Sequence, residues 1–149
     1  MAYEELARGA WLEGMALDGD VVWVSDVIAG GIWSINGPHA GRVWREGVLW
    51  IGALLANHDG RILHSGSHGL GWFDPAGDGQ GVLVDTYDGK PIPGFNEMAP
   101  DDLGGMIFGT VDIPAFERSD APGPSQLYHL SGNGRLTLLE DGLKFTNGL

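Results

Sequence analysis

The sequence predicts an all-β protein, a β-propeller of four-stranded antiparallel blades with about three blades present. A short apolar segment recurs at intervals of about 40 to 50 residues, a period typical of propellers and solenoids. Each complete copy leads into a turn and a second strand-like segment. Glycine accounts for 26 of 149 residues, which suits many tight turns between short strands. The four copies begin at Trp11, Trp50, Gly94 and Phe145.

The first unit, approximately residues 11–47, reads as one blade. An Asp-Gly turn at 18–20 joins its first two apolar segments, and this dipeptide is a strong hairpin signal. Paired glycines at 30–31 then separate the second segment from the third. The predicted strands cover residues 12–17, 21–25, 32–35 and 41–46.

The second and third units, approximately residues 48–90 and 91–142, repeat this order. The predicted strands of the second unit cover residues 51–56, 61–65, 69–74 and 81–86. Those of the third unit cover residues 96–99, 106–110, 126–130 and 135–140. Residues 143–149 begin a fourth unit. The alternative is a β-sandwich of about twelve short strands, but the repeat extends to equivalent positions, which favours the propeller.

Three blades do not close a propeller, because closure typically takes about four to eight blades. We therefore expect residues 1–149 to be the N-terminal half of a larger propeller. A complementary C-terminal half or self-association would complete it. In a symmetric dimer, the strand of Glu13 in one copy would need the place of the strand begun by Asn147 in the other. That overlap counts against self-association.

Charge and composition exclude several classes of partner. A net charge of -12 argues against nucleic acid but is compatible with metal cations and neutral substrates. The chain has no cysteine, which excludes disulfides and thiolate chemistry and fits a reducing compartment. Residues 1–9 carry Glu4 and Glu5 and lack the apolar core of a signal peptide. No run approaches the roughly 18 apolar residues of a membrane span, so we expect a cytoplasmic protein without membrane or nucleic-acid partners.

Four equivalent positions suggest a ring of side chains. They are Glu13, Ile51, Asn96 and Asn147, each at the start of an innermost strand. Innermost strands line the channel of a propeller, so these residues are expected at its mouth. One carboxylate and two amide oxygens suit a hard cation, above all Ca²⁺. The alternative is that Asn96 and Asn147 precede turns, where asparagine is common for local reasons.

The motifs around these positions resemble the SMP-30/gluconolactonase/regucalcin-like (LRE-like) family over residues 11–149. They are Leu-Glu-Gly at 12–14, Phe-Asn-Glu at 95–97, Phe-Gly-Thr-Val-Asp at 108–112 and Gly-Leu-Lys-Phe-Thr-Asn-Gly-Leu at 142–149. The resemblance implies the first half of a six-bladed propeller that hydrolyses small lactones or esters. It also implies a divalent cation at the channel mouth, Ca²⁺ or else Mg²⁺, Mn²⁺ or Zn²⁺.

The resemblance also implies roles for individual residues. Glu13 and Asn147 would be metal ligands, and Asn96 would be a ligand or a substrate contact beside the metal. The general base of the family, an Asp, is expected outside this chain, so the catalytic residue is unknown here. The alternative function is a non-enzymatic ligand-binding propeller with a structural calcium ion.

The chain departs from the family at three positions. Met15 stands where Pro is frequent, Gly94 where sugar-lactone members often carry Arg, and Glu97 where Asp is frequent. Losing the Arg removes a rigid fork of donors suited to polyhydroxylated acids, so a less polar lactone or ester is expected. Trp11, Met15 and Met98, expected near the rim, fit that substrate. The predicted substrate-binding residues are Asn96, Glu97, Met15, His68 and Phe116.

Two of these residues lie in connecting segments. His68 is expected in a loop on the same face as the ring, where it could donate a hydrogen bond to substrate. Phe116 lies in a long insertion at 112–125, between two strands of the third unit. This insertion is placed to act as a lid or pocket wall, and a disordered excursion is the alternative.

Overall fold

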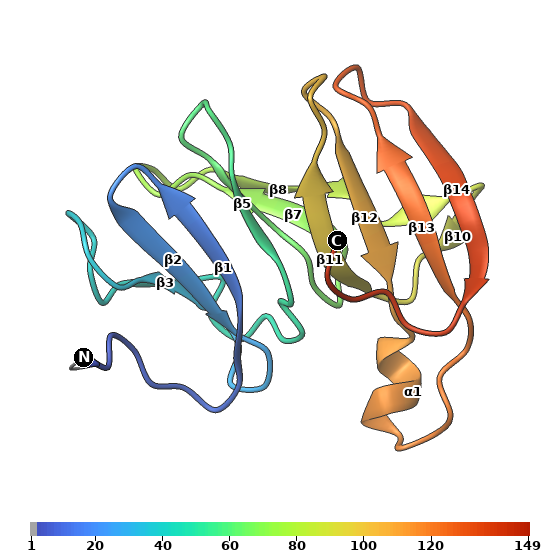
Figure 1. The fold of residues 1–149 in the computed structure, drawn as a ribbon, viewed down its shortest axis with the longest axis horizontal. Coiled ribbons are helices and arrows are strands. Elements are labelled where there is room, and N and C mark those ends of the chain that lie inside the picture. Colours follow the sequence, from blue (N-terminus) through green and yellow to red (C-terminus); the bar gives the residue numbers. More distant parts are fainter. Residues whose placement is uncertain (1–2) are drawn as a thin grey trace.

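Three four-stranded antiparallel sheets make up most of the molecule (Figure 1). The computed structural model describes residues 3–149, so Met1 and Ala2 of the expected N-terminal segment lie outside the described residues. The first sheet contains β1 (Leu12–Asp18), β2 (Val21–Asp26), β3 (Ile32–Ser34) and β4 (Val43–Trp44). The second contains β5 (Leu54–Ala56), β6 (Ile62–His64), β7 (Leu70–Phe73) and β8 (Gln80–Val84). The third contains β11 (Phe95–Pro100), β12 (Met106–Thr110), β13 (Ser125–Leu130) and β14 (Leu136–Leu143).

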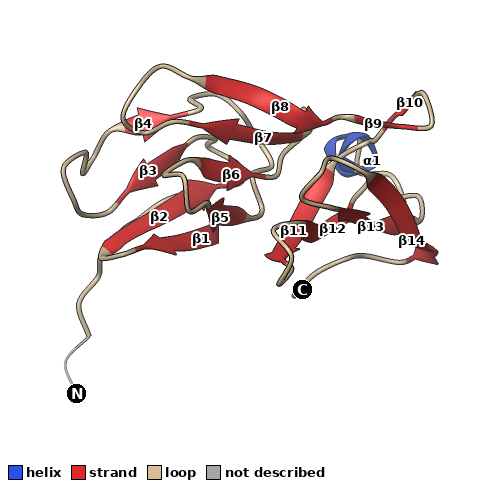
Figure 2. Ribbon diagram, turned by 90° about the horizontal axis from the view of Figure 1, so that it is seen from above, coloured by secondary structure: helices blue, strands red, loops and turns tan. Residues whose placement is uncertain are grey.

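The sheets stand beside one another as blades, and in each the spatial order of strands follows the chain (Figure 2). The first strands, β1, β5 and β11, are the innermost, and β5 contacts both of the others. The predicted four-stranded antiparallel blades are therefore confirmed. The described residues also form the hairpin β9 (Thr86–Tyr87) and β10 (Lys90–Pro91) and the helix α1 (Ile113–Glu117). No helix in residues 3–149 is long and apolar enough to cross a membrane.

Two hydrophobic cores fill the spaces between neighbouring blades. Between the first and second blades, the rings of Trp23, Trp44 and Phe73 pack with centroids 5.0 to 5.7 Å apart. Between the second and third blades, the stacked rings of Phe108 and Tyr128 in the third blade, with centroids 5.3 Å apart, pack with buried residues of the second. Aromatic side chains bury large apolar areas, so these contacts fix the angle between adjacent blades.

The fold corrects three expectations from the sequence. Ile51 is fully buried in the core between the first two blades and does not line the channel. The predicted first strand of the second blade starts later, at Leu54, and the irregular backbone before it turns Ile51 inward. Met98 is buried between the second and third blades, not at the rim. The expected fourth-blade strand is absent from the described residues, because residues 144–149 form a tail without strand structure.

Candidate functional site

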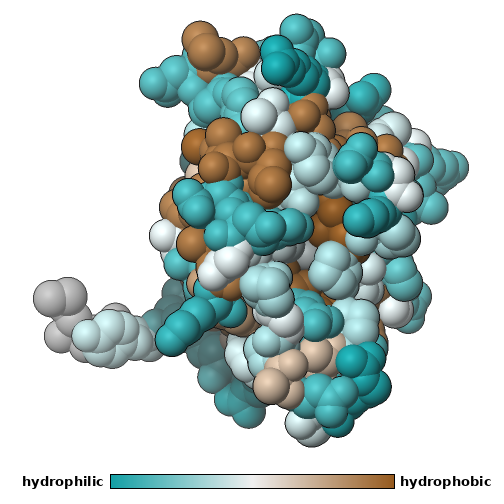
Figure 3. Space-filling view, turned by 90° about the vertical axis from the view of Figure 1, so that its right-hand side faces the viewer, coloured by the Kyte–Doolittle hydropathy of each residue, from teal (hydrophilic) through white to brown (hydrophobic). Residues whose placement is uncertain are grey.

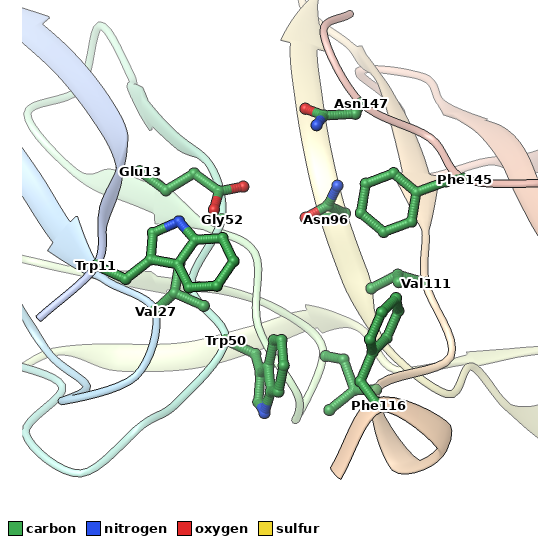
Figure 4. A pocket seen from close by; sticks show the side chains of 11 residues that line it. Trp11, Glu13, Val27, Trp50, Gly52, Asn96, Val111, Phe116, Phe145 and Asn147 are labelled. Atoms are coloured by element: carbon green, nitrogen blue, oxygen red, sulfur yellow. The ribbon is translucent and has the colours of Figure 1, made fainter. Parts of the chain in front are cut away.

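A cavity of about 440 Å³ lies between the inner strands of the first and third blades (Figure 4). All three blades, α1 and the C-terminal tail contribute to it. The lining residues are Trp11, Glu13, Val27, Trp50, Gly52, Asn96, Val111, Ile113, Phe116, Phe145 and Asn147. The volume suits a small organic molecule. The structure thus brings together Glu13, Asn96 and Asn147, which we call the polar end of the cavity.

Gly52 lies where Glu13 and Asn96 approach each other. A Cβ atom added to Gly52 would be 2.8 Å from Asn96 Oδ1 and 3.5 Å from Glu13 Oε1. Both oxygens therefore border the space that the missing side chain leaves free. In Figure 4 the carboxylate of Glu13 and the amide of Asn96 face each other across this space. The glycine keeps room between two oxygen donors from different blades.

The C-terminal tail orients the buried amide of Asn96. Asn96 Nδ2 donates a hydrogen bond to the carbonyl oxygen of Thr146 at 2.6 Å, which leaves Oδ1 free to face the cavity. Thr146 Oγ1 donates to the carbonyl oxygen of Thr110 at 2.8 Å. The Thr146 side chain also packs over Gly109, where no Cβ atom could be accommodated. These contacts hold the tail against β12 and bring Asn147 to the cavity.

Two buried serines fix the backbone of the polar end. Ser25 Oγ accepts a hydrogen bond from the backbone N–H of the residue after Glu13 at 3.0 Å and donates to the carbonyl oxygen of Ile51 at 2.7 Å. Ser65 Oγ accepts from the backbone N–H of Gly52 at 3.1 Å. Buried hydrogen bonds of this kind are costly to break, because each loss leaves a polar group unpaired. They hold the first two blades in register at the mouth.

The polar end carries negative charge. Glu13 is the one charged side chain among the residues that line the cavity. Glu97, which follows Asn96, is partly buried, and this burial together with the charge of Glu13 raises the pKa of the Glu97 carboxyl group. A cation near the mouth would favour the ionised forms of Glu13 and Glu97 and so offset the rise in the pKa of Glu97. The electrostatics therefore favour cation binding.

The donor set of the polar end determines which metal it could hold. Within residues 3–149, no three His, Cys, Asp or Glu side chains are grouped closely enough to bind a metal ion. A cation here would instead use the carboxylate of Glu13 and the amide oxygens of Asn96 and Asn147. Oxygen-only sets of this kind fit hard cations such as Ca²⁺, which complete their coordination with water or further oxygens. The residues present therefore fit a hard divalent cation.

The side of the cavity away from the polar end is aromatic. We call Trp11, Trp50, Phe116 and Phe145 the aromatic wall. The ring centroid of Phe116 lies 6.1 Å from that of Trp50 and 6.0 Å from that of Phe145, so the wall is continuous across α1 and the tail. Figure 4 shows these rings around one opening, with Trp50 and Phe116 below the polar end and Phe145 beside Asn96.

Helix α1 presents Phe116 to the cavity. Asp112 precedes the helix, and its side chain accepts hydrogen bonds from the backbone N–H groups of Ala115 at 3.1 Å and Gly123 at 3.0 Å. One carboxylate thus ties together the two ends of the insertion. The expectation of a pocket wall agrees with this geometry, whereas the disordered alternative is contradicted by it.

Three of the predicted substrate-binding residues do not line the cavity. Met15 lies beyond the register shift that separates it from Leu12 on β1, is 66% exposed and is not part of the lining. His68 lies in a neighbouring groove beside Pro93 and Glu117. Glu97 follows the lining residue Asn96, at the point where the register of β11 shifts between Phe95 and Met98, and is not itself part of the lining. Asn96 and Phe116 are the two of that group inside the cavity.

Trp50, Gly52 and Phe145 line the cavity but were not predicted as site residues from the sequence. A signal for them was present, because Trp50 stands two positions before Gly52, just as Trp11 stands two before Glu13 and Phe145 two before Asn147. Residues two apart in an extended segment point to the same side. Aligning the second repeat on Gly52 instead of Ile51 would have revealed a row of aromatic residues beneath the ring. The apolar residues Val27, Val111 and Ile113 were also missed.

The fold and the cavity define a class of protein, a β-propeller whose innermost strands bring oxygen donors together at a common mouth. Residues 11–149 match the family described as SMP-30/Gluconolactonase/LRE-like region. The chain belongs to this family, and the resemblance noted in its motifs is confirmed. No curated protein matches the chain significantly.

Solved structures of similar fold include a putative gluconolactonase, with 19% sequence identity and a TM-score of 0.72, covering 91% of this chain and 50% of that one. A calcium-binding protein, regucalcin, from Agrobacterium tumefaciens str. C58 has 17% identity and a TM-score of 0.71, covering 94% and 46%. A luciferin-regenerating enzyme has 19% identity and a TM-score of 0.72, covering 93% and 48%. The chain thus spans about half the length of these structures, and the likeness supports the propeller fold.

Proposed function

We propose that this chain carries part of the active site of a divalent-cation-dependent hydrolase of lactones or esters. The observation that carries the proposal is the convergence of Glu13, Asn96 and Asn147 on one cavity, with Gly52 leaving space between their oxygens. Membership of a family described by gluconolactonase supports the reaction class. The description of one similar structure as calcium-binding supports Ca²⁺, with Mg²⁺, Mn²⁺ or Zn²⁺ as other candidates.

The residues of the polar end would each have a distinct task. Glu13 supplies the negative charge that retains the cation, and Asn96, held by Thr146, supplies a neutral oxygen in a fixed direction. Asn147 supplies a second amide. A bound divalent cation would polarise the substrate carbonyl and stabilise the charge that develops on its oxygen. The base that accepts the proton of the attacking water is expected to be an Asp outside this chain.

Further blades would complete the site. Met15, Leu17 and Val43 are 66%, 65% and 47% exposed in the first sheet, and Leu139 is 47% exposed in the third. Figure 3 shows apolar atoms among polar ones on the side of the molecule that carries β14. Clustered apolar surface is typical of contact faces. The contacting blades would come from a complementary C-terminal half or from a second copy.

The first test is the cation affinity of Glu13→Gln, measured by calorimetry with Ca²⁺. This change keeps the shape of the side chain and removes its charge, so the affinity should fall about 100-fold. Glu140→Gln is a matched control, because Glu140 is exposed on β14 and does not line the cavity. Equal Ca²⁺ affinity in Glu13→Gln and the unmodified protein would contradict the assignment.

The second candidate function is a ligand-binding propeller with a structural cation. It is favoured by the fact that Glu13 is the one charged side chain lining the cavity in the described chain, so these residues offer no separate base. Lactone hydrolysis by the propeller assembled with the complementary half that supplies the base, assayed in the presence of Ca²⁺ by titrating the released acid, separates the two functions. Ca²⁺ binding without hydrolysis would support the second.

A further inference from the structure

Helix α1 places an aliphatic side chain in the space beside Gly94. A Cβ atom at Gly94 would lie 2.5 Å from Cδ1 of Ile113 and 2.7 Å from the carbonyl oxygen of Val111. Ile113 is the first residue of α1, is 1% exposed and lines the cavity. The insertion therefore fills, with an aliphatic side chain, the space that a residue two positions before Asn96 would occupy. A polar side chain at position 94 has no room.

The polar edge of Trp50 is also directed away from the cavity. Its Nε1 donates a hydrogen bond to Glu117 Oε1 at 3.1 Å, and Glu117 lines the neighbouring groove, not the cavity. Figure 4 shows the indole nitrogen pointing away from the polar end. Trp50 has a left-handed backbone with φ of +62°, rare for a bulky residue and typical of functional sites. What Trp50 offers to the cavity is therefore an apolar ring surface.

The aromatic wall is available to a ligand. Trp11, Phe145 and Phe116 keep 52%, 46% and 37% of their surface exposed although they share one cavity. Large aromatic side chains left open side by side indicate a binding surface. Apart from the polar end, the lining offers the indole N–H of Trp11 as a further side-chain donor, since the Trp50 nitrogen is already engaged, and a single N–H cannot hydrogen-bond several hydroxyl groups. A polyhydroxylated ligand would lose hydrogen bonds to water without replacing them.

We propose that this cavity selects neutral lactones or esters that carry an aryl group. The aryl ring would lie against Phe116, Phe145 and Trp50, and the carbonyl would face the polar end. The inference rests on the proposed function for its reaction class, but the aryl selectivity concerns binding alone. It can therefore be tested with molecules that are not hydrolysed.

The test compares two lactams with the full chain by calorimetry in the presence of Ca²⁺. One is 3,4-dihydro-2-quinolinone, in which a δ-lactam is fused to a benzene ring, and the other is gluconolactam, a polyhydroxylated δ-lactam. The aryl lactam should bind at least about tenfold more tightly, as expected when polar groups enter an apolar pocket unpaired. Equal or tighter binding of gluconolactam would overturn the proposal.

Variants locate the selectivity in the wall. Phe116→Ala and Phe145→Ala should each weaken binding of the aryl lactam about tenfold, because each removes a full ring from the pocket. Phe116→Leu should retain most of the affinity. Tyr3→Ala is the matched control, since Tyr3 is 95% exposed and lies outside the cavity. Unchanged aryl-lactam affinity in both alanine variants would overturn the proposal.

The outcomes also separate this inference from the proposed function. Hydrolysis of dihydrocoumarin and glucono-δ-lactone at equal rates would support the hydrolase and overturn the selectivity. Selective binding of the aryl lactam, without hydrolysis of either lactone by the propeller completed with its C-terminal half, would support the selectivity and contradict the hydrolase.

Discussion

The polar end and the aromatic wall of the cavity are supported in different ways. At the polar end, buried hydroxyl groups hold the backbone. Ser25 and Ser65, at the ends of β2 and β6, accept hydrogen bonds from the residue after Glu13 and from Gly52, and Thr146 Oγ1 donates to the backbone carbonyl oxygen of Thr110 at the end of β12. The serine contacts recur at equivalent places in the first two blades, so the repeat itself builds this part of the polar end.

The aromatic wall rests on irregular segments. Trp50 precedes β5 with a left-handed backbone, Phe116 lies on the five-residue helix α1, and Phe145 lies on the tail. Few hydrogen bonds fix these side chains. The two parts can therefore change independently. The polar end requires accurate placement, whereas the wall can vary its shape and so alter specificity.

The largest effect should follow from Gly52→Ala. The new Cβ atom would lie 2.8 Å from Asn96 Oδ1, so either the amide or the strand must move. We expect Ca²⁺ affinity to fall about 100-fold, a loss at the upper limit of that seen when the surroundings of a metal ligand change. Affinity for the aryl lactam, measured without Ca²⁺, should change little.

Gly79→Ala is the control for this substitution. Its added Cβ atom would make only ordinary contacts, with Trp72 ring atoms 3.4 Å away. If Gly52→Ala bound Ca²⁺ as tightly as Gly79→Ala does, the space beside Gly52 would not matter. The rigid character assigned to the polar end would then be wrong.

The same contrast explains how much could be predicted from the sequence. Glu13, Asn96 and Asn147 could be placed together because each occupies the same position in a repeat, and repeats share their geometry. Ile51 was assigned in place of Gly52 because the second repeat was aligned one residue too early, just before β5, where the backbone is irregular. Such a shift by one residue exchanges the buried and the open side.

The contribution of α1 to the wall depends on tertiary contacts. The packing of Ile113 over Gly94 and the hydrogen bond between Trp50 and Glu117 join residues far apart in the sequence. No periodicity connects them. The sequence predicted a wall at Phe116 from the position of the insertion, but it could not predict which side chains the helix would meet.

Asp26, the last residue of β2, joins the first blade to the segment that carries Trp11 of the aromatic wall. Burial alone would raise the pKa of its carboxyl group, but the backbone N–H groups of Ala29, Ala10, Ile28 and Trp11 all donate to it and hold the pKa below its usual value. A β2 residue thus anchors the segment that carries Trp11. A depressed carboxyl pKa stabilises the fold above about pH 4, and the contribution is lost as the pH falls through the folded-state value.

Asp26→Asn should lower the free energy of unfolding by about 2 kcal/mol at pH 7, the difference expected between charged and neutral hydrogen bonds at a buried site. The difference should shrink below about pH 4 as the native carboxylate becomes protonated. Urea unfolding of the variant and the unmodified protein, at pH 7 and below about pH 4, measures this difference in the free energy of unfolding. Asp102→Asn, in an exposed turn, is the control. A pH-independent difference would show that the charge of Asp26 is unimportant.

The smallest effect should follow from Glu117→Gln, the one polar contact that orients Trp50 from α1. Because this hydrogen bond is exposed and can persist with a neutral acceptor, its loss of charge should cost only about 0.5 kcal/mol. Affinity for the aryl lactam should therefore fall no more than about threefold, with Glu140→Gln as the matched control. A loss as large as that of Phe116→Ala would mean that the wall depends on a fixed polar contact, as the polar end does. The contrast between an accurately placed polar end and an adaptable wall would then have to be abandoned.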